Sequence, residues 1–91
     1  MNIYLVMGTT GEYSDSVDWP VMAYFTEKKA QEHVLNADHK AKELYGMYPR
    51  HEEHRIPKGA NEFDPQMQTD YSGTSYFIYN APIGDKPEEK K

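Results

Sequence analysis

Three short apolar runs and one long amphipathic stretch organise this chain of 91 residues. Residues 3–7 and 19–25 are rich in β-branched, aromatic and aliphatic side chains, and residues 74–80 alternate around a Tyr-Phe-Ile-Tyr run. These runs predict three β-strands. Because proline has no N–H to donate to a ladder, the second strand should begin at Pro20 or lie at a sheet edge.

The amphipathic stretch predicts a helix over residues 27–45. Thr26 suits the N-cap, and Gly46 with Pro49 soon after it suits the end of the helix. The apolar positions recur at spacings of three or four residues: Ala30, Val34, Ala37, Ala41 and Leu44, with Leu35 and Tyr45 widening the stripe.

The resulting order, β-β-α-β, predicts an α+β fold with a three-stranded, mainly antiparallel sheet. We expect the first strand in the centre, giving sheet order 2-1-3. Pro20 cannot donate a hydrogen bond to a further strand, so the third strand is not expected to pair with the second. The helix should cover one face and make a thin core. The other face should be wet, or be covered by the long loop or by a second subunit.

Residues 46–72 form the long irregular loop of this prediction, because glycine and proline interrupt every period there. A connection of that length is usually functional or disordered. Ile56, Phe63 and Met67 should pin it to the domain. We therefore expect a single domain at residues 1–84 and a charged, frayed tail at residues 85–91.

Charge is distributed unevenly along the chain, whose formal net charge is −5. Residues 1–25 and 61–85 contain acidic residues but no lysine or arginine. We call them the cation-free segments. If they meet in space they form one acidic, tyrosine-rich face, which argues against direct nucleic-acid binding.

Motifs for metal or phosphate binding are weak. His51 and His54 flank two glutamates, but their spacing is not that of the HExxH zinc motif. Pro49 and Pro57 lie close by in sequence, so a solvated loop is the better interpretation. Residues 8–11 follow a strand but lack a phosphate-loop ending, which favours a turn. We expect no metal and no cofactor.

Catalysis and membrane insertion find no support in the sequence either. No serine has an adjacent base in any spacing that implies a nucleophile, so we expect no enzyme and no catalytic residues. The chain has no cysteine, no signal-peptide pattern and no apolar run of membrane-spanning length. These features predict a cytoplasmic protein without membrane contact.

Acidic and aromatic residues occur together in both cation-free segments. Exposed tyrosine and tryptophan are common binding hot spots, and carboxylates attract arginine and lysine of a partner. The alternative is that Trp19, Phe63 and Tyr71 pack the loop down and leave the acids in solvent. The candidate partner-binding residues are Glu12, Tyr13, Asp15, Trp19, Asp64, Asp70 and Tyr71.

The same stretches resemble a family of small uncharacterised proteins of bacteriophages and prophages. The motifs behind the resemblance cover most of residues 2–83: TGEYSD at 10–15, DWP at 18–20, AY at 23–24, AQEHV at 30–34, FDPQMQ at 63–68 and DYSGTSY at 70–76. It implies a source and a size, and the location would then be the host cytoplasm. It implies no catalytic residues.

Together these observations predict a non-enzymatic, phage-type accessory protein that binds and modulates or inhibits a host or phage protein. A partner with a basic surface, such as a nucleic-acid-binding or defence protein, would suit the negative field. Two alternatives stay open. One is a small-ligand binder or sponge that stacks a nucleotide-like ring between the two loops. The other is a homo-oligomeric structural module, for example a homodimer, that pairs through an edge strand or through the uncovered sheet face.

Overall fold

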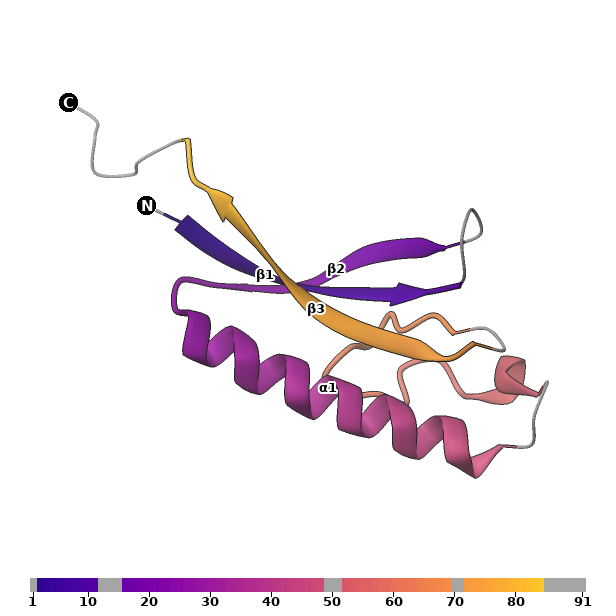
Figure 1. The fold of residues 1–91 in the computed structure, drawn as a ribbon. Coiled ribbons are helices and arrows are strands. Elements are labelled where there is room, and N and C mark those ends of the chain that lie inside the picture. Colours follow the sequence, from indigo (N-terminus) through magenta and orange to yellow (C-terminus); the bar gives the residue numbers. More distant parts are fainter. Residues whose placement is uncertain (1, 12–15, 49–51, 70–71, 85–91) are drawn as a thin grey trace.

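The structure is a computed structural model that describes residues 2–11, 16–48, 52–69 and 72–84. It confirms the predicted β-β-α-β order (Figure 1). The predicted tail at residues 85–91 lies outside the described residues. The elements are β1 (Asn2–Thr10), β2 (Val17–Tyr24), α1 (Glu27–Met47), the short 3-10 helix η2 (Glu53–Arg55) and β3 (Thr74–Pro82).

The three strands form one antiparallel sheet in the order β2-β1-β3, as predicted. Pro20 lies on β2, an edge strand, where its missing N–H leaves no gap in a central ladder. The register between β1 and β2 shifts next to it, because Val6 pairs with Met22 and Met7 pairs with Pro20. Val21 is the extra residue of this irregularity.

Strand β1 is longer than the sequence indicated. The prediction of a turn at residues 8–11 was wrong, because β1 continues to Thr10 and only Gly11 has a left-handed φ, of 98°. Gly8 faces Trp19 across the ladder. A Cβ on Gly8 would lie 2.5 Å from the indole, so glycine serves here to make room for a ring within the sheet.

Helix α1 runs past Gly46, which was wrongly predicted to follow the helix end. The helix ends instead at Met47, and the C-cap residue Tyr48 has an extended backbone (φ −121°, ψ 145°), which is the conformation that a following proline favours. Thr26 is the N-cap as predicted, although its side chain makes no capping hydrogen bond.

The core is thin and lies between α1 and one face of the sheet. Ala30, Ala37, Ala41 and Leu44 are buried on the helix. Val6, Trp19 and Tyr76 are buried on the sheet. Leu35 is 69% exposed, so the prediction that it widens the buried stripe was wrong. No helix in the described part of the chain has the length and hydrophobicity to cross a bilayer.

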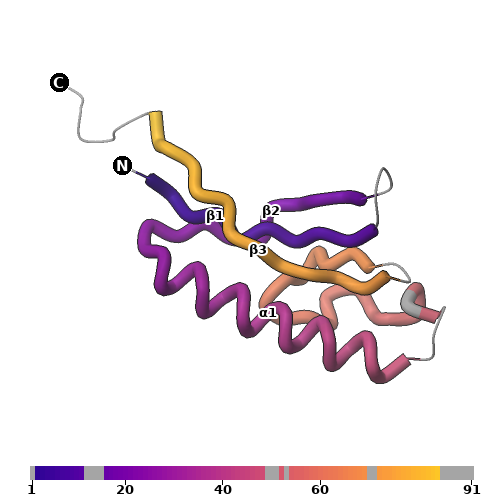
Figure 2. Tube along the Cα trace, in the orientation of Figure 1, coloured from indigo at the N-terminus to yellow at the C-terminus, as the bar shows by residue number. Residues whose placement is uncertain are grey.

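The described residues between α1 and β3 are residues 48, 52–69 and 72–73, which we call the long segment. They have no regular structure apart from η2 and lie on the same side of the sheet as α1 (Figure 2). Phe63 and Met67 pack against Ala37, Ala41 and Tyr76, which confirms that they pin the segment to the domain. The turn between Asn61 and Met67 is closed by backbone hydrogen bonds from Asp64 N to Asn61 O and from Met67 N to Asp64 O.

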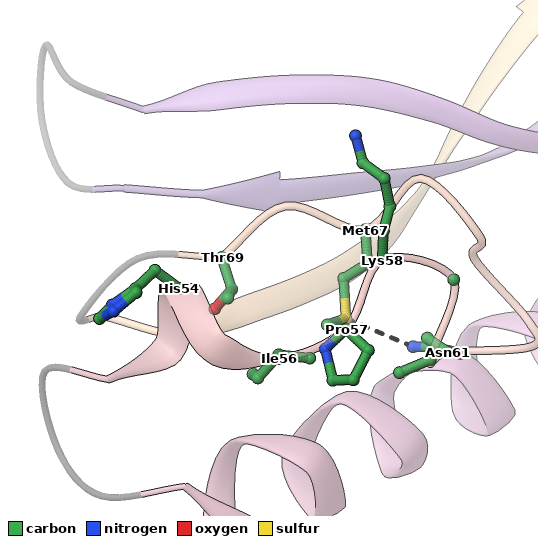
Figure 3. Close-up of a pocket in the computed structure, with 9 residues that line it drawn as sticks. His54, Ile56, Pro57, Lys58, Asn61, Met67 and Thr69 are labelled. Atoms are coloured by element: carbon green, nitrogen blue, oxygen red, sulfur yellow. Dashed lines mark hydrogen bonds between the residues drawn. The ribbon is translucent and has the colours of Figure 1, made fainter.

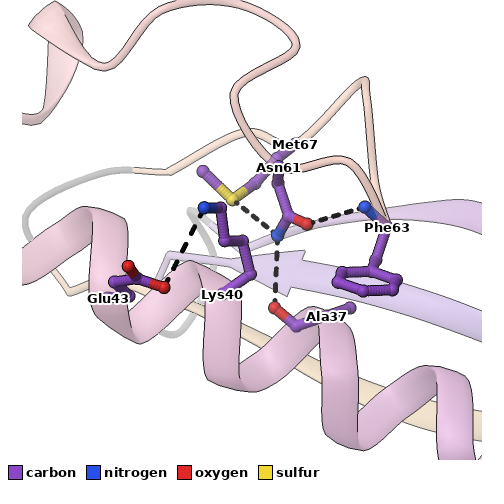
Figure 4. Close-up of polar contacts among 6 residues, drawn as sticks. All are labelled: Ala37, Lys40, Glu43, Asn61, Phe63 and Met67. Carbon is purple, nitrogen blue, oxygen red and sulfur yellow. Dashed lines mark hydrogen bonds and ion pairs between the residues drawn. The ribbon is translucent and has the colours of Figure 1, made fainter.

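Two polar side chains hold the long segment against α1. Asn61 Nδ2 donates to Ala37 O at 3.1 Å while Asn61 Oδ1 accepts from Phe63 N at 3.0 Å (Figure 4). His33 Nε2 lies 2.7 Å from Phe63 O, and because a carbonyl only accepts, that nitrogen carries hydrogen. His33 Nδ1 lies 2.8 Å from Tyr24 OH, so one helix residue contacts both β2 and the long segment.

Candidate interaction surface

Trp19 and Asp64, two of the seven candidate residues, meet in the interior. Trp19 Nε1 donates to Asp64 Oδ2 at 2.9 Å. The Trp19 side chain reaches this position over Gly8, and Asp64 reaches it from the turn of the long segment. Trp19 is 7% exposed and Asp64 is 1% exposed, so neither offers a surface to a partner.

Asp64 is the centre of a buried polar network that also contains Trp19, Tyr76 and Asn61. Tyr76 OH donates to the same Asp64 oxygen at 2.7 Å and lies 3.4 Å from Asn61 Nδ2, from which it accepts. Burial, followed by the hydrogen bond to Asp64, raises the pKa of the Tyr76 hydroxyl. No lysine or arginine forms an ion pair with Asp64 among the described residues. The network is a structural anchor for the long segment.

The other five candidates, Glu12, Tyr13, Asp15, Asp70 and Tyr71, lie outside the described residues. Their chain neighbours are described and are joined. Thr10 Oγ1 donates to Gly73 O at 2.6 Å, and Gly11 N donates to Ser72 Oγ at 3.2 Å. We call residues 10–11 and 72–73 the paired stems. In the sequence, Glu12, Tyr13 and Asp15 follow the first stem, and Asp70 and Tyr71 precede the second.

The sheet has a second side, which the sequence predicted to be wet or covered by the long loop or by a second subunit, without naming residues on it. In the described part of the chain, α1 and the long segment both lie on the opposite side. A hollow of about 520 Å³ lies on this side of the three strands. We call its lining residues the outer sheet face: Leu5, Met7, Asp18, Pro20, Phe77 and Tyr79.

The outer sheet face is apolar with one acidic group. Phe77 is 38% exposed and Tyr79 is 57% exposed, both large values for rings in a strand. None of the three strands contains a lysine or an arginine, and Asp18 is the only charged residue in them. One feature of the sequence could have indicated this surface. Leu5 and Met7 are apolar and alternate with Val6, which is buried, so β1 is apolar on both sides.

A different hollow, of about 320 Å³, lies within the long segment (Figure 3). Its lining includes Lys58, Asn61 and Met67 and contains no tyrosine or tryptophan. The imidazole of His54 is the only aromatic ring among its lining residues. The stacking pocket of the ligand-binding alternative therefore has no counterpart in this hollow.

The predicted absence of a metal centre concerns residues that are described only in part. His51 lies outside the described residues, and Glu52 forms an ion pair of 3.3 Å with Arg55. The described residues contain no group of three histidine, cysteine or acidic side chains arranged to hold a metal ion.

Comparisons with protein-family models, with curated proteins and with solved structures found no match. The resemblance to phage proteins therefore stays a prediction from sequence motifs.

Proposed function

We propose that this protein is a non-enzymatic accessory protein that binds a protein partner with a basic, partly apolar surface and thereby modulates or inhibits it. The observation that supports this proposal best is the outer sheet face: an uncovered apolar surface on strands that contain no cation. The phage origin and the action in the host cytoplasm rest on the motif resemblance alone.

The chemistry of the outer sheet face favours such a partner. Apolar side chains of a partner would enter the hollow beside Phe77, and an arginine or lysine would meet the exposed carboxylate of Asp18. Aromatic rings at an interface are common hot spots. A nucleic-acid backbone would instead meet a surface of the wrong sign.

The proposal also includes the acidic residues that adjoin the paired stems in sequence. The stems join the ends of β1 and β3, and the sequences that continue from them carry Glu12, Asp15 and Asp70. Trp19 and Asp64 act indirectly, because their hydrogen bond fixes the long segment on the far side of the sheet. They are positioning residues for the fold that presents the surface.

The test is a pull-down from bacterial host lysate with the immobilised chain, at low and at high salt. Asp18→Lys should abolish capture of any specific partner, and Met7→Gln should weaken it. The matched control is Glu32→Lys on the exposed side of α1, which changes the net charge equally, from −5 to −3.

The proposal is supported if one protein is captured by the native chain and by the Glu32→Lys variant but not by the Asp18→Lys variant. High salt should release this protein from the native chain. Equal capture by all three chains, or capture indifferent to salt, would show that the outer sheet face is not the binding surface.

A further inference from the structure

The two edges of the sheet differ in how they are protected. On β2 the edge carries Pro20, the register irregularity at Val21 and the charged Asp18, three features that discourage pairing with another strand. On β3 the register with β1 runs without a shift from Thr74 to Pro82. This strand has no charged residue and no proline before its last position.

We propose that the free edge of β3 pairs with β3 of a second copy of this chain, antiparallel and in full register. A strand of nine residues that pairs with itself over its whole length has its two-fold axis at the central residue, Ile78. Position 77 then faces position 79 of the other copy, and the six strands form one continuous sheet.

Side-chain exposure supports this register. Phe77 and Tyr79 point away from α1 and are unusually exposed. In the proposed pairing, Phe77 of each copy is the direct cross-strand neighbour of Tyr79 of the other. Aromatic cross-strand pairs stabilise antiparallel strands. Both rings would thus gain a packing partner on the outer side of the sheet.

Charge favours a second copy over a foreign basic strand. The whole chain is negative, so two copies repel each other in most orientations. The strand itself is neutral and adds no carboxylate to a contact along β3, and the carboxylate of Asp38 on the neighbouring α1 is paired with Lys42. A basic strand would find no carboxylate along the same edge.

The position of α1 leaves room for the second copy. The helix packs on the first half of β3, where Tyr76 contacts Ala37 and Ala41. The second half rises away from α1, towards the end of the strand (Figure 2). Antiparallel pairing puts the covered half of one strand beside the uncovered half of the other, so the two helices lie diagonally across the sheet.

The experiment measures the mass of the purified native chain by sedimentation velocity over a concentration series. We expect a reversible dimer. Phe77→Lys combined with Tyr79→Lys places like charges opposite each other and should raise the dissociation constant at least about tenfold. Phe77→Glu combined with Tyr79→Lys places opposite charges together and should restore the dimer. Met22→Lys on β2, at 47% exposure, is a control that adds one positive charge away from β3 and should leave the dimer intact.

A native chain that stays monomeric throughout the series would overturn the proposal. So would a dimer that survives the double lysine variant in folded form, or one that the Glu/Lys pair does not restore. Circular dichroism confirms that each variant is folded. Since this test uses the purified chain alone, its result is independent of the pull-down that tests the proposed function.

Discussion

Trp19 donates its indole hydrogen to a carboxylate oxygen of Asp64, a residue 45 positions later in the chain. This bond links an edge strand to a segment without regular structure. It also leaves Asp64 buried with neutral donors around it. Stability should therefore depend on this carboxylate more than on any exposed acid of the chain.

Replacement of Asp64 by alanine should lower the free energy of unfolding by about 2–4 kcal/mol, since the donors on Trp19 and Tyr76 would be left buried without an acceptor. Urea unfolding followed by tryptophan fluorescence measures this directly, as Trp19 is the only tryptophan. Asp18→Ala is the control and should change stability by no more than about 0.5 kcal/mol. Equal effects of the two substitutions would contradict the structural role of Asp64.

The same chemical change should have opposite effects at two glycines. Gly8→Ala should destabilise the protein by about 1–3 kcal/mol, because the new methyl group would overlap the Trp19 ring. Gly46→Ala should stabilise it by about 0.5–1 kcal/mol, since Gly46 lies within α1 and nothing crowds its Cβ position. Thermal unfolding of both variants checks the signs, and a stabilised Gly8→Ala protein would exclude the close approach.

Stability should fall at alkaline pH because of Tyr76. Its pKa is raised in the folded state by burial and by the hydrogen bond to Asp64, so the folded protein keeps this proton when the unfolded chain loses it, near pH 10. The contribution is complete below that pH and decreases as the pH rises above it. Tyr76→Phe removes this part of the pH dependence.

The measurement is urea unfolding at a series of pH values between about 8 and 11.5. The free energy of unfolding of the native chain should fall more steeply above pH 10 than that of the Tyr76→Phe variant. Parallel curves for the two proteins would show that Tyr76 ionises equally in both states.

Loss of the Asn61 side chain should loosen the long segment. Asn61→Ala removes the bond to Ala37 O and leaves Phe63 N without its acceptor, which should cost about 1–3 kcal/mol. Trypsin should then cut faster after Arg55 or Lys58, both in the long segment. Asn36→Ala on the exposed side of α1 is the control, and an equal cleavage rate in both variants would argue against the anchor.

The sheet order could be predicted because its determinants are local. Pro20 marks one strand as an edge, and a helix between the second and third strands leaves few ways to close the sheet. The helix end was predicted too early, at residue 45, because Gly46 suits the position after a helix, whereas the restriction that Pro49 places on Tyr48 fits the observed end at Met47.

The buried polar network could not be predicted, because its parts are far apart and ambiguous. Asp64 stands among other acids in a stretch typical of a solvated loop, and only the three-dimensional structure shows that Trp19 and Tyr76 converge on it. Gly8 was ambiguous for a similar reason. A glycine after an apolar run usually begins a turn, whereas here it accommodates a ring from the neighbouring strand.

The central position of β1 has a consequence for folding during synthesis. This strand leaves the ribosome before either of its neighbours, and β3 follows only after the whole helix and the long segment have been made. Until then the edge of β1 that will pair with β3 has no partner. The nascent protein therefore passes through a stage in which aggregation through this edge competes with completion of the sheet.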